Sequence, residues 1–286
     1  MNDLLIHPHT QKQLANYLAN PSHAITLVAP SGSGKHSIAQ HIAASLLNVD
    51  SERLASHPYF KVINSIDNKA ISIESIRGLE HFLSLKVPNN QTVQRVIVVE
   101  DAETLSTEAQ TAFLKTLEEP PTGTIFILST THDQALLPTI RSRSPRLLVT
   151  KPDYNSLKQH FDNLYKNESD VKQALLVSGG LPGLTSALLS QSSDHPLLPA
   201  TELARQILSA NRYQRLIKVD ELVKDRQLCL NTLFILQQMA HLSLLSATSV
   251  NADRWFNILK LCYEAQDALQ ANNQAKLVLT NLMLQL

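Results

Sequence analysis

The stretch that decides the fold is RVIVVEDAETLSTEAQTAFLKTLEEPPTGTIFILSTTHDQALLPTIRSRS, residues 95–144. It opens with a β-branched run that ends in two carboxylates, Glu100 and Asp101. A helical segment follows and closes on LEEPP, and a second apolar run, IFILSTT, comes next. Continuous apolar runs are typical of parallel strands that are covered on both faces. The stretch therefore predicts a strand–helix–strand unit inside a parallel sheet.

Strand-like and helix-like segments alternate outward from this stretch through the first 150 residues. The predicted strands cover residues 24–28, 60–63, 96–99 and 125–128, and the predicted helices cover residues 9–18, 37–47 and 72–83. Such alternation favours an α/β fold with a doubly wound parallel sheet. After Pro152 the strand signals end and the pattern is helical.

With 286 residues the chain is long enough for two or three domains, each with its own core. We predict an α/β domain over residues 1–150 and a small helical unit with a polar linker over 151–199. A helical domain is predicted over 200–286. The middle unit is interrupted by the glycine-rich run GGLPG at 179–183.

The charge balance bears on nucleic-acid binding. The chain has 25 basic and 25 acidic side chains, so its formal net charge is zero. A protein that holds DNA alone usually has a basic surplus, because phosphate neutralisation supplies most of the affinity. We therefore expect any role with nucleic acid to be shared within a complex.

Cysteine usage and hydropathy predict the compartment. Cys229 and Cys262 lie far apart without a CxxC partner, which favours two small hydrophobes in a helical core over a disulfide or metal site. The chain does not begin with a charged and then apolar signal segment. The most apolar helical run, 228–245, is interrupted by polar residues and fits a buried helix better than a membrane span. We expect a cytoplasmic protein with no membrane partner.

The sequence APSGSGKHS, residues 29–37, forms a glycine-rich loop between a predicted strand and a predicted helix. Glycines let backbone N–H groups point at phosphate, and the helix N-terminus adds positive potential. This context predicts a P-loop in which Lys35 reaches the β- and γ-phosphates. The candidate nucleotide-binding residues are Pro30, Ser31, Gly32, Ser33, Gly34, Lys35, His36 and Ser37.

Two positions depart from the P-loop pattern. Ala29 replaces the first glycine, which is tolerable if its φ stays negative. His36 replaces the Ser or Thr that holds Mg²⁺, and imidazole is a poor ligand for a hard cation. Ser37 lies about 100° further around the helix and should point elsewhere. We expect ATP or ADP binding to be weak or vestigial, with Mg²⁺ only alongside nucleotide. The alternative is a degenerate loop that keeps its shape and holds no nucleotide.

Glu100 and Asp101 stand where an NTPase places its metal-binding Asp and the carboxylate that activates water. Their order is reversed here. Glu100 could still reach a metal through water, whereas the shorter Asp101 falls short of an attacking water. An acidic pair that caps the next segment is an equally good interpretation.

Arg143 lies in the Ser-Arg-Ser segment that follows the second strand of the opening stretch. An arginine at a domain edge can stabilise the charge on a phosphoryl group in a neighbouring subunit, as an arginine finger does. The alternative is a surface arginine paired with a carboxylate. From the residues alone this alternative is favoured, because Arg141 and Arg146 flank the position.

The order of APSGSGKHS, HPYF, ISIESIRGLEHFLSLK, VIVVEDAETLS, FLKTLEEPP, LSTTHD and SRS resembles bacterial clamp-loader AAA+ subunits of DNA polymerase III. The likeness is greatest to the delta-prime type. SGGLPGLTSALL and the terminal NNQAKLVLTNLMLQL add to it, so the resemblance covers nearly the whole chain. LKTLEEPP together with the SRS segment is its most specific part.

The resemblance implies an AAA+ core, a helical lid and a C-terminal collar that builds a five-subunit ring with delta and gamma/tau subunits. Such a ring places the sliding clamp on primer–template DNA. A delta-prime subunit acts largely as a stator with little or no ATPase activity. Carried over, Arg143 is a finger that acts in trans, Lys35 is a remnant nucleotide contact, and Thr130 or Thr131 lies in the sensor-1 region.

Several residues depart from that family. Ser144 replaces a usual cysteine, a small change that should leave Arg143 in place. Many delta-prime relatives carry a four-cysteine zinc module, yet there is no cysteine between Lys35 and Glu100, so we expect no zinc. Leu184 stands where motor subunits carry a sensor-2 arginine. Leu184, together with His36 and the reversed Glu100-Asp101 pair, favours the stator over the alternative, an ATP-hydrolysing gamma/tau-type motor or another AAA+ ATPase.

Overall fold

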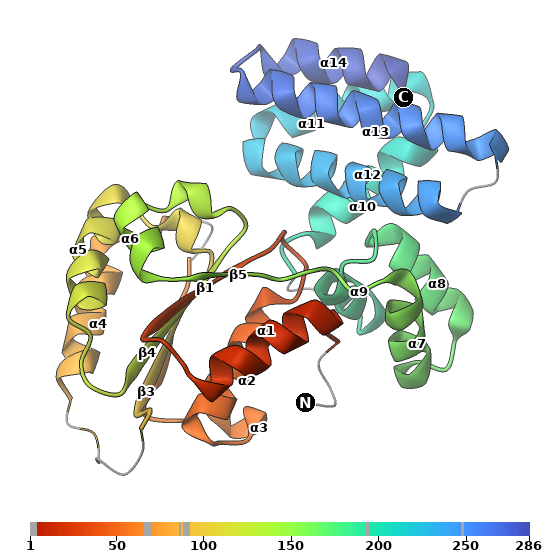
Figure 1. Cartoon of the computed structure of the whole chain (residues 1–286). Helices are drawn as coiled ribbons and strands as arrows, with labels where there is room; N and C mark the ends of the chain where they lie inside the picture. Colours follow the sequence, from red (N-terminus) through yellow and green to blue (C-terminus); the bar gives the residue numbers. More distant parts are fainter. Residues whose placement is uncertain (1–4, 66–69, 86, 88–91, 193–194, 247–248) are drawn as a thin grey trace. The chain divides into compact units, whose positions relative to one another are not determined.

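The computed structural model describes residues 5–65, 70–85, 87, 92–192, 195–246 and 249–286 (Figure 1). Lys86 and residues 193–194 of the predicted linker lie outside the described residues. The chain divides into two compact units, Met1–Pro152 and Asp153–Leu286. The first corresponds to the predicted α/β domain. The second contains both the predicted lid and the predicted helical domain, whose separation stays a prediction.

The first unit alternates strands with helices. Its strands are β1 (Ala24–Val28), β2 (Phe60–Ile63), β3 (Arg95–Val99), β4 (Thr124–Thr130) and β5 (Arg146–Leu148). Its helices are α1 (Pro8–Ala19), α2 (Lys35–Leu47), α3 (Ser51–Leu54), α4 (Ile73–Ser84), α5 (Thr107–Glu118) and α6 (Pro138–Arg143), with 3₁₀ turns η1 (Ala102–Thr104) and η2 (Asp133–Ala135).

The strands form one parallel sheet in the order β2-β3-β4-β1-β5. Val28 at the end of β1 is in register with Thr130 of β4, and Leu128 of β4 with Val99 of β3. The loop after β1, the acidic pair after β3 and the residues after β4 therefore lie at one edge of the sheet. Open α/β sheets bind their ligands outside this carboxyl edge.

The side chains of each central strand alternate between two hydrophobic cores, one on each face of the sheet. On one face Ile97, Val99, Phe126 and Leu128 pack with α4, α5 and α6. On the other face α1 and α2 pack against the alternating residues of the same two strands, Val96, Val98, Ile125 and Ile127. Figure 1 shows α1 and α2 across the sheet from α4 and α5. Burial on both faces explains why the strands read as continuous apolar runs.

The four predicted strands are confirmed, and β5 is a fifth that the sequence did not reveal. β5 has three residues, and only Leu147 of them is buried. Arg146 and Leu148 on either side are exposed, so the segment has no apolar run to mark it. Its pairing with β1 depends on the position of α6, which no local pattern encodes.

The described part of the second unit consists of helices and no strand. They are α7 (Tyr154–Leu164), α8 (Glu168–Val177), α9 (Pro182–Leu189), α10 (Leu198–Ser209), α11 (Arg212–Lys224), α12 (Arg226–Ser246), α13 (Ser249–Gln270) and α14 (Ala275–Gln285).

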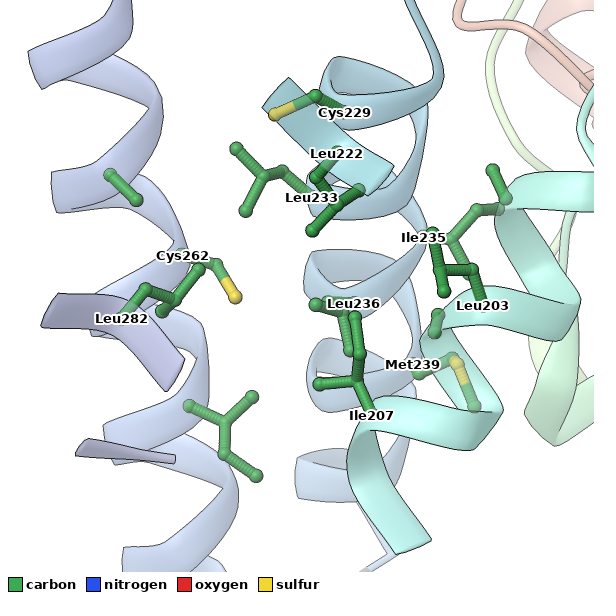
Figure 2. Packing of buried hydrophobic residues seen from close by; sticks show 14 of the residues in the cluster. Leu203, Ile207, Leu222, Cys229, Leu233, Ile235, Leu236, Met239, Cys262 and Leu282 are labelled. Atoms are coloured by element: carbon green, nitrogen blue, oxygen red, sulfur yellow. The ribbon is translucent and has the colours of Figure 1, made fainter. Parts of the chain in front are cut away.

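Figure 2 shows the core of this unit, in which α12 lies among α10, α11, α13 and α14. Cys229 and Cys262 are both buried there as free thiols, as the sequence predicted. Burial raises the pKa of Cys229 to about 11 and that of Cys262 to about 12. By length and composition alone Arg226–Leu245 could cross a membrane, but half of that window is buried inside the unit. Leu236 at its centre is fully buried, as in the core helix of a globular unit.

The glycine-rich turn between α8 and α9 lies directly on α12. Gly179 has a positive φ of +63°, and a Cβ there would lie 2.3 Å from Cβ of Gln238. The side chains of Ser178 and Thr185 also share a buried hydrogen bond of 2.7 Å beneath this turn. Close packing of this turn on α12 therefore requires glycine at position 179.

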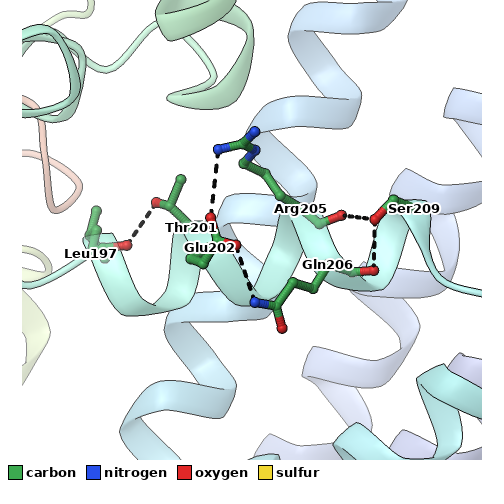
Figure 3. A network of polar contacts seen from close by, with 6 residues as sticks. All are labelled: Leu197, Thr201, Glu202, Arg205, Gln206 and Ser209. Atoms are coloured by element: carbon green, nitrogen blue, oxygen red, sulfur yellow. Dashed lines mark hydrogen bonds and ion pairs between the residues drawn. The ribbon is translucent and has the colours of Figure 1, made fainter.

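The polar side chains of α10 hydrogen-bond within the helix itself (Figure 3). Glu202 pairs with Arg205 at 3.5 Å and accepts from Gln206 at 3.1 Å. Thr201 and Ser209 donate to backbone carbonyls one turn earlier. Such pairs stabilise a helix by a few tenths of a kcal/mol, so this network supports the helix and indicates no ligand.

Candidate nucleotide-binding site and arginine site

The glycine-rich loop has the backbone geometry of a P-loop. Gly32 and Gly34 have φ values of +76° and +87°, and α2 begins directly after them at Lys35. Left-handed values at these two positions explain why glycine stands there. Ala29 does not have a positive φ, so it meets the condition for replacing the first glycine. Ser37 is exposed.

Lys35 folds back onto its own loop. Its Nζ donates to the carbonyl of Ala29 at 2.6 Å and to that of Pro30 at 3.3 Å, and the side chain is buried. Burial lowers the pKa of Lys35, while the negative charges of Glu103 and Asp101 oppose that shift. The ammonium therefore has loop carbonyls as partners at the place where it would meet phosphate.

His36 and Glu100 form an ion pair between Nδ1 and Oε1. This pair joins the first turn of α2 to the end of β3, across 64 positions of sequence. The hydrogen bond to Glu100 raises the pKa of His36, outweighing the opposite effect of partial burial. The carboxylate that could have approached a metal is thus bonded to the residue that replaces the metal-binding hydroxyl.

Asp101 directly follows Glu100 with a left-handed φ of +46°. Its backbone N–H donates to Oγ of Ser129 at 3.3 Å, and its carbonyl accepts from the N–H and hydroxyl of Thr104 at 2.7 and 2.8 Å. Burial, and after it the charge of Glu103, raises the pKa of the Asp101 carboxyl. Asp101 is the N-cap residue of η1, but its side chain makes no cap hydrogen bond, and the Glu100 carboxylate is bonded to His36. The capping interpretation of the two carboxylates is therefore wrong.

Glu103 is the residue of this region that the sequence did not reveal. Its Oε1 accepts from the N–H and the hydroxyl of Thr131, at 2.9 and 2.6 Å. Burial would raise the pKa of Glu103, but these hydrogen bonds prevail and lower it. Thr130 is buried, and its hydroxyl donates to the carbonyl of His132 at 3.0 Å. Glu103 thereby links the predicted sensor-1 residues to the segment that follows β3. In the sequence, the only sign of this role is a carboxylate two residues after Asp101.

Arg143 lies at the C-terminal end of α6, and its contacts involve none of the residues described above. Its Nη2 pairs with Oε1 of Glu118 at 2.8 Å, and its Nη1 donates to the carbonyl of Thr139 at 3.2 Å. The Arg143 side chain is 36% exposed. Glu118 is the first residue of the EEPP run, so the two most specific parts of the family-like sequence touch each other. The carboxylate pairing of the alternative interpretation is present.

Ser144 and Leu184, which stand where the family pattern has a cysteine and an arginine, are both buried. The Ser144 hydroxyl lies 2.6 Å from the hydroxyl of Thr26 in β1, so its polar atom has a partner. Leu184 is fully buried in the apolar core of the second unit, as an arginine with a phosphate partner would not be. The binding and catalytic roles of all these residues stay predictions.

The family comparison covers the first unit from residue 6 onward and one residue beyond it. The family model described as "DNA polymerase III, delta subunit" matches residues 6–153. That span contains the glycine-rich loop, the acidic pair and Arg143.

Individual relatives are more distant. The delta' subunit of DNA polymerase III from Pseudomonas aeruginosa is 28% identical over an alignment of 214 residues, and the match covers 66% of this chain and 62% of that protein. The delta' subunit from Escherichia coli is 26% identical over an alignment of 200 residues, which covers 64% of this chain and 59% of that protein. A gamma/tau subunit from Mycobacterium tuberculosis is 32% identical over an alignment of 137 residues, which covers 43% of this chain and 23% of that protein. The chain spans about six tenths or less of the length of these relatives.

Among solved structures, a gamma subunit-related protein of DNA polymerase III from Thermotoga maritima matches with a TM-score of 0.51. The two chains are 19% identical, and the match covers 96% of this chain and 97% of the other. The likeness confirms the predicted fold class, an AAA+ type α/β unit followed by helices.

Proposed function

The chain belongs to the DNA polymerase III delta-subunit family, and from that premise we propose that it is a delta-prime-like stator of the clamp loader. In this role it supplies Arg143 in trans to the ATP site of a neighbouring subunit and turns over little or no ATP itself. Its partners are delta and gamma/tau subunits in a five-membered ring in the cytoplasm. The ring places the sliding clamp on primer–template DNA.

One observation carries the stator proposal: His36 and Glu100 are bonded to each other. To hold Mg²⁺, a P-loop NTPase needs a hydroxyl at the first position after the lysine and an acidic residue at the end of another strand of the sheet. Imidazole does not replace that hydroxyl for a hard cation. To bind a metal, Glu100 would first have to leave His36. Leu184, in place of a sensor-2 arginine, supports the same conclusion.

The arginine role is supported by the exposure and chemistry of Arg143. A planar guanidinium with five donors suits a transferring phosphoryl group better than an ammonium does. Arg143 is part of the SRS segment in the matched family region and is more than a third exposed. The zero net charge of the chain agrees with DNA contact shared among subunits.

The alternative, an ATP-hydrolysing gamma/tau-type subunit, has one observation in its favour. The loop keeps the left-handed Gly32 and Gly34 and places Lys35 at the start of α2. That geometry suffices to cradle phosphate. Binding of nucleotide without Mg²⁺-dependent turnover would be compatible with both the loop and the stator proposal, whereas steady turnover by the isolated chain would favour the motor.

The test is a clamp loader reconstituted with Arg143→Ala or with Lys35→Ala in this chain. Arginine fingers contribute about 10³-fold or more to turnover at the site they serve. We expect Arg143→Ala to reduce DNA-stimulated ATPase activity and clamp loading sharply, and Lys35→Ala to leave both near wild type. Unchanged activity with Arg143→Ala would refute the arginine role. A severe loading defect with Lys35→Ala would instead favour a working nucleotide site.

A further inference from the structure

The ends of α5 and α6 meet in a contact that holds the guanidinium of Arg143. Nη2 pairs with Glu118 at 2.8 Å, and Nη1 donates to the Thr139 carbonyl at 3.2 Å and reaches Oγ of Ser142 at 3.5 Å. Within the described residues these contacts leave Nε and one hydrogen of Nη2 without an acceptor. One edge of the guanidinium is therefore fixed, and donors remain for a ligand.

Helix α5 also fixes the helix that bears Arg143. Gln110 of α5 accepts from the N–H of Leu137 at 2.8 Å and donates to the carbonyl of Ala135 at 3.2 Å. Ile140 is fully buried in the core cluster that includes α5. Arg143 follows Ile140 by three residues and so lies on the same side of α6, toward α5. Figure 1 shows the two helices side by side.

The charge of Glu118 is not explained by helix stability. It is the last residue of α5, where the helix dipole disfavours a carboxylate. Arg143, by contrast, ends α6 with the favourable sign. The two side chains are 49% and 36% exposed, and an ion pair this open to solvent contributes little to folding stability. What the pair does determine is the place of the guanidinium.

We propose that Glu118 is the positioning residue for Arg143. This inference rests on the proposed function, in which Arg143 meets a phosphoryl group of a nucleotide on the neighbouring subunit. A free arginine side chain has many rotamers, and holding one of them in advance reduces the ordering needed at the reaction. Glu118 itself touches neither nucleotide nor metal, so its effect passes through Arg143.

The experiment uses the reconstituted loader with the full-length chain. Four forms are compared: wild type, Glu118→Gln, Arg143→Ala and the double substitution. Glu119→Gln is the matched control, because Glu119 is the adjacent residue with the same charge and no ion pair to a described residue. Thermal unfolding of each isolated chain checks that the fold is kept. ATP turnover is measured as separate kcat and KM values.

We expect Glu118→Gln to lower kcat about threefold to tenfold with KM for ATP within about twofold, because only positioning is lost. Glu119→Gln should match wild type. In the Arg143→Ala background, Glu118→Gln should have no further effect.

The possible failures are distinguishable. If Arg143→Ala leaves kcat unchanged, the proposed function itself fails. If Arg143→Ala lowers kcat but Glu118→Gln does not, the arginine role stands and the positioning role is refuted. An equal loss with Glu119→Gln, or a further loss in the Arg143→Ala background, would also refute it, because Glu118 would then act through general charge or another partner.

Discussion

The two charged regions of the first unit use their charges in opposite ways. At the carboxyl edge of the sheet, Lys35 is bonded to loop carbonyls and His36 to Glu100. At the end of α6, Arg143 has one solvent-open ion pair and donors to spare. We call the first region, with Lys35, His36 and Glu100, the nucleotide edge, and the second, with Arg143, the arginine edge. The charged groups of the nucleotide edge have partners within the chain, whereas the guanidinium of the arginine edge has donors available to another molecule. In the proposed function, the first edge no longer supports ATP turnover and the second acts on the neighbouring subunit.

The largest expected effect on nucleotide affinity comes from separating His36 and Glu100 at the carboxyl edge of the sheet. His36→Thr restores the hydroxyl that Mg²⁺ requires and releases Glu100. We expect the affinity of the isolated chain for Mg·ATP to rise about tenfold, equivalent to about 1.4 kcal/mol. Calorimetry with Mg²⁺ and with EDTA measures the change.

His36→Ala is the matched control, since it removes the imidazole without adding a hydroxyl. It should show no Mg²⁺-dependent gain. If His36→Thr binds no better than wild type, the His36–Glu100 pair is not what limits this edge, and the contrast between the two regions needs another cause.

The sequence could predict those parts of this contrast that depend on residues close together along the chain. The strands, the loop and α2 follow from local patterns, since β-branched runs and glycines act through their own backbone. The candidate residues Lys35, Glu100 and Asp101 could be placed at one edge because parallel strands share their carboxyl ends.

The partners of those residues could not be predicted in the same way. His36 meets Glu100 only because β1 and β3 are separated by β4 alone in the sheet. Glu103 meets Thr131, 28 positions away, because β3 and β4 are adjacent in the sheet. Glu118 meets Arg143, 25 positions away, because α5 packs against α6. Side-chain pairing over such separations depends on tertiary packing rather than on periodicity.

The contact between α5 and α6 at Gln110 tests the arginine edge through folding stability rather than ligand affinity. Gln110→Ala would remove the acceptor for Leu137 N–H and the donor to the Ala135 carbonyl. A hydrogen-bonding group left unpaired in a buried place costs about 1–3 kcal/mol. We expect the free energy of unfolding of the full chain to fall by that amount in urea titrations.

Thr111→Ala serves as the neighbouring control on the exposed face of α5, with an expected change within about 0.5 kcal/mol. Equal stability of Gln110→Ala and Thr111→Ala would show that α6 is held by apolar packing alone. The fixed position of Arg143 would then depend on Ile140 and its neighbours.

The smallest effect is the pH dependence of the His36–Glu100 pair. Glu100 raises the pKa of His36 in the folded chain, so the stabilisation is full below the unfolded pKa of about 6.5. It is lost as the pH rises through the higher folded value. Because the His36 side chain is 55% exposed, solvent screening limits the effect to less than about 1 kcal/mol.

Urea unfolding of wild type and His36→Gln between pH 5.5 and 8.5 measures this contribution as the difference between the two curves. Wild type should exceed the variant in stability at pH 5.5, and the excess should shrink toward pH 8.5. A difference that stays constant with pH would mean that the imidazole acts by packing rather than by charge. The nucleotide edge would then be closed by shape, and raising the pH would not release Glu100 for a metal.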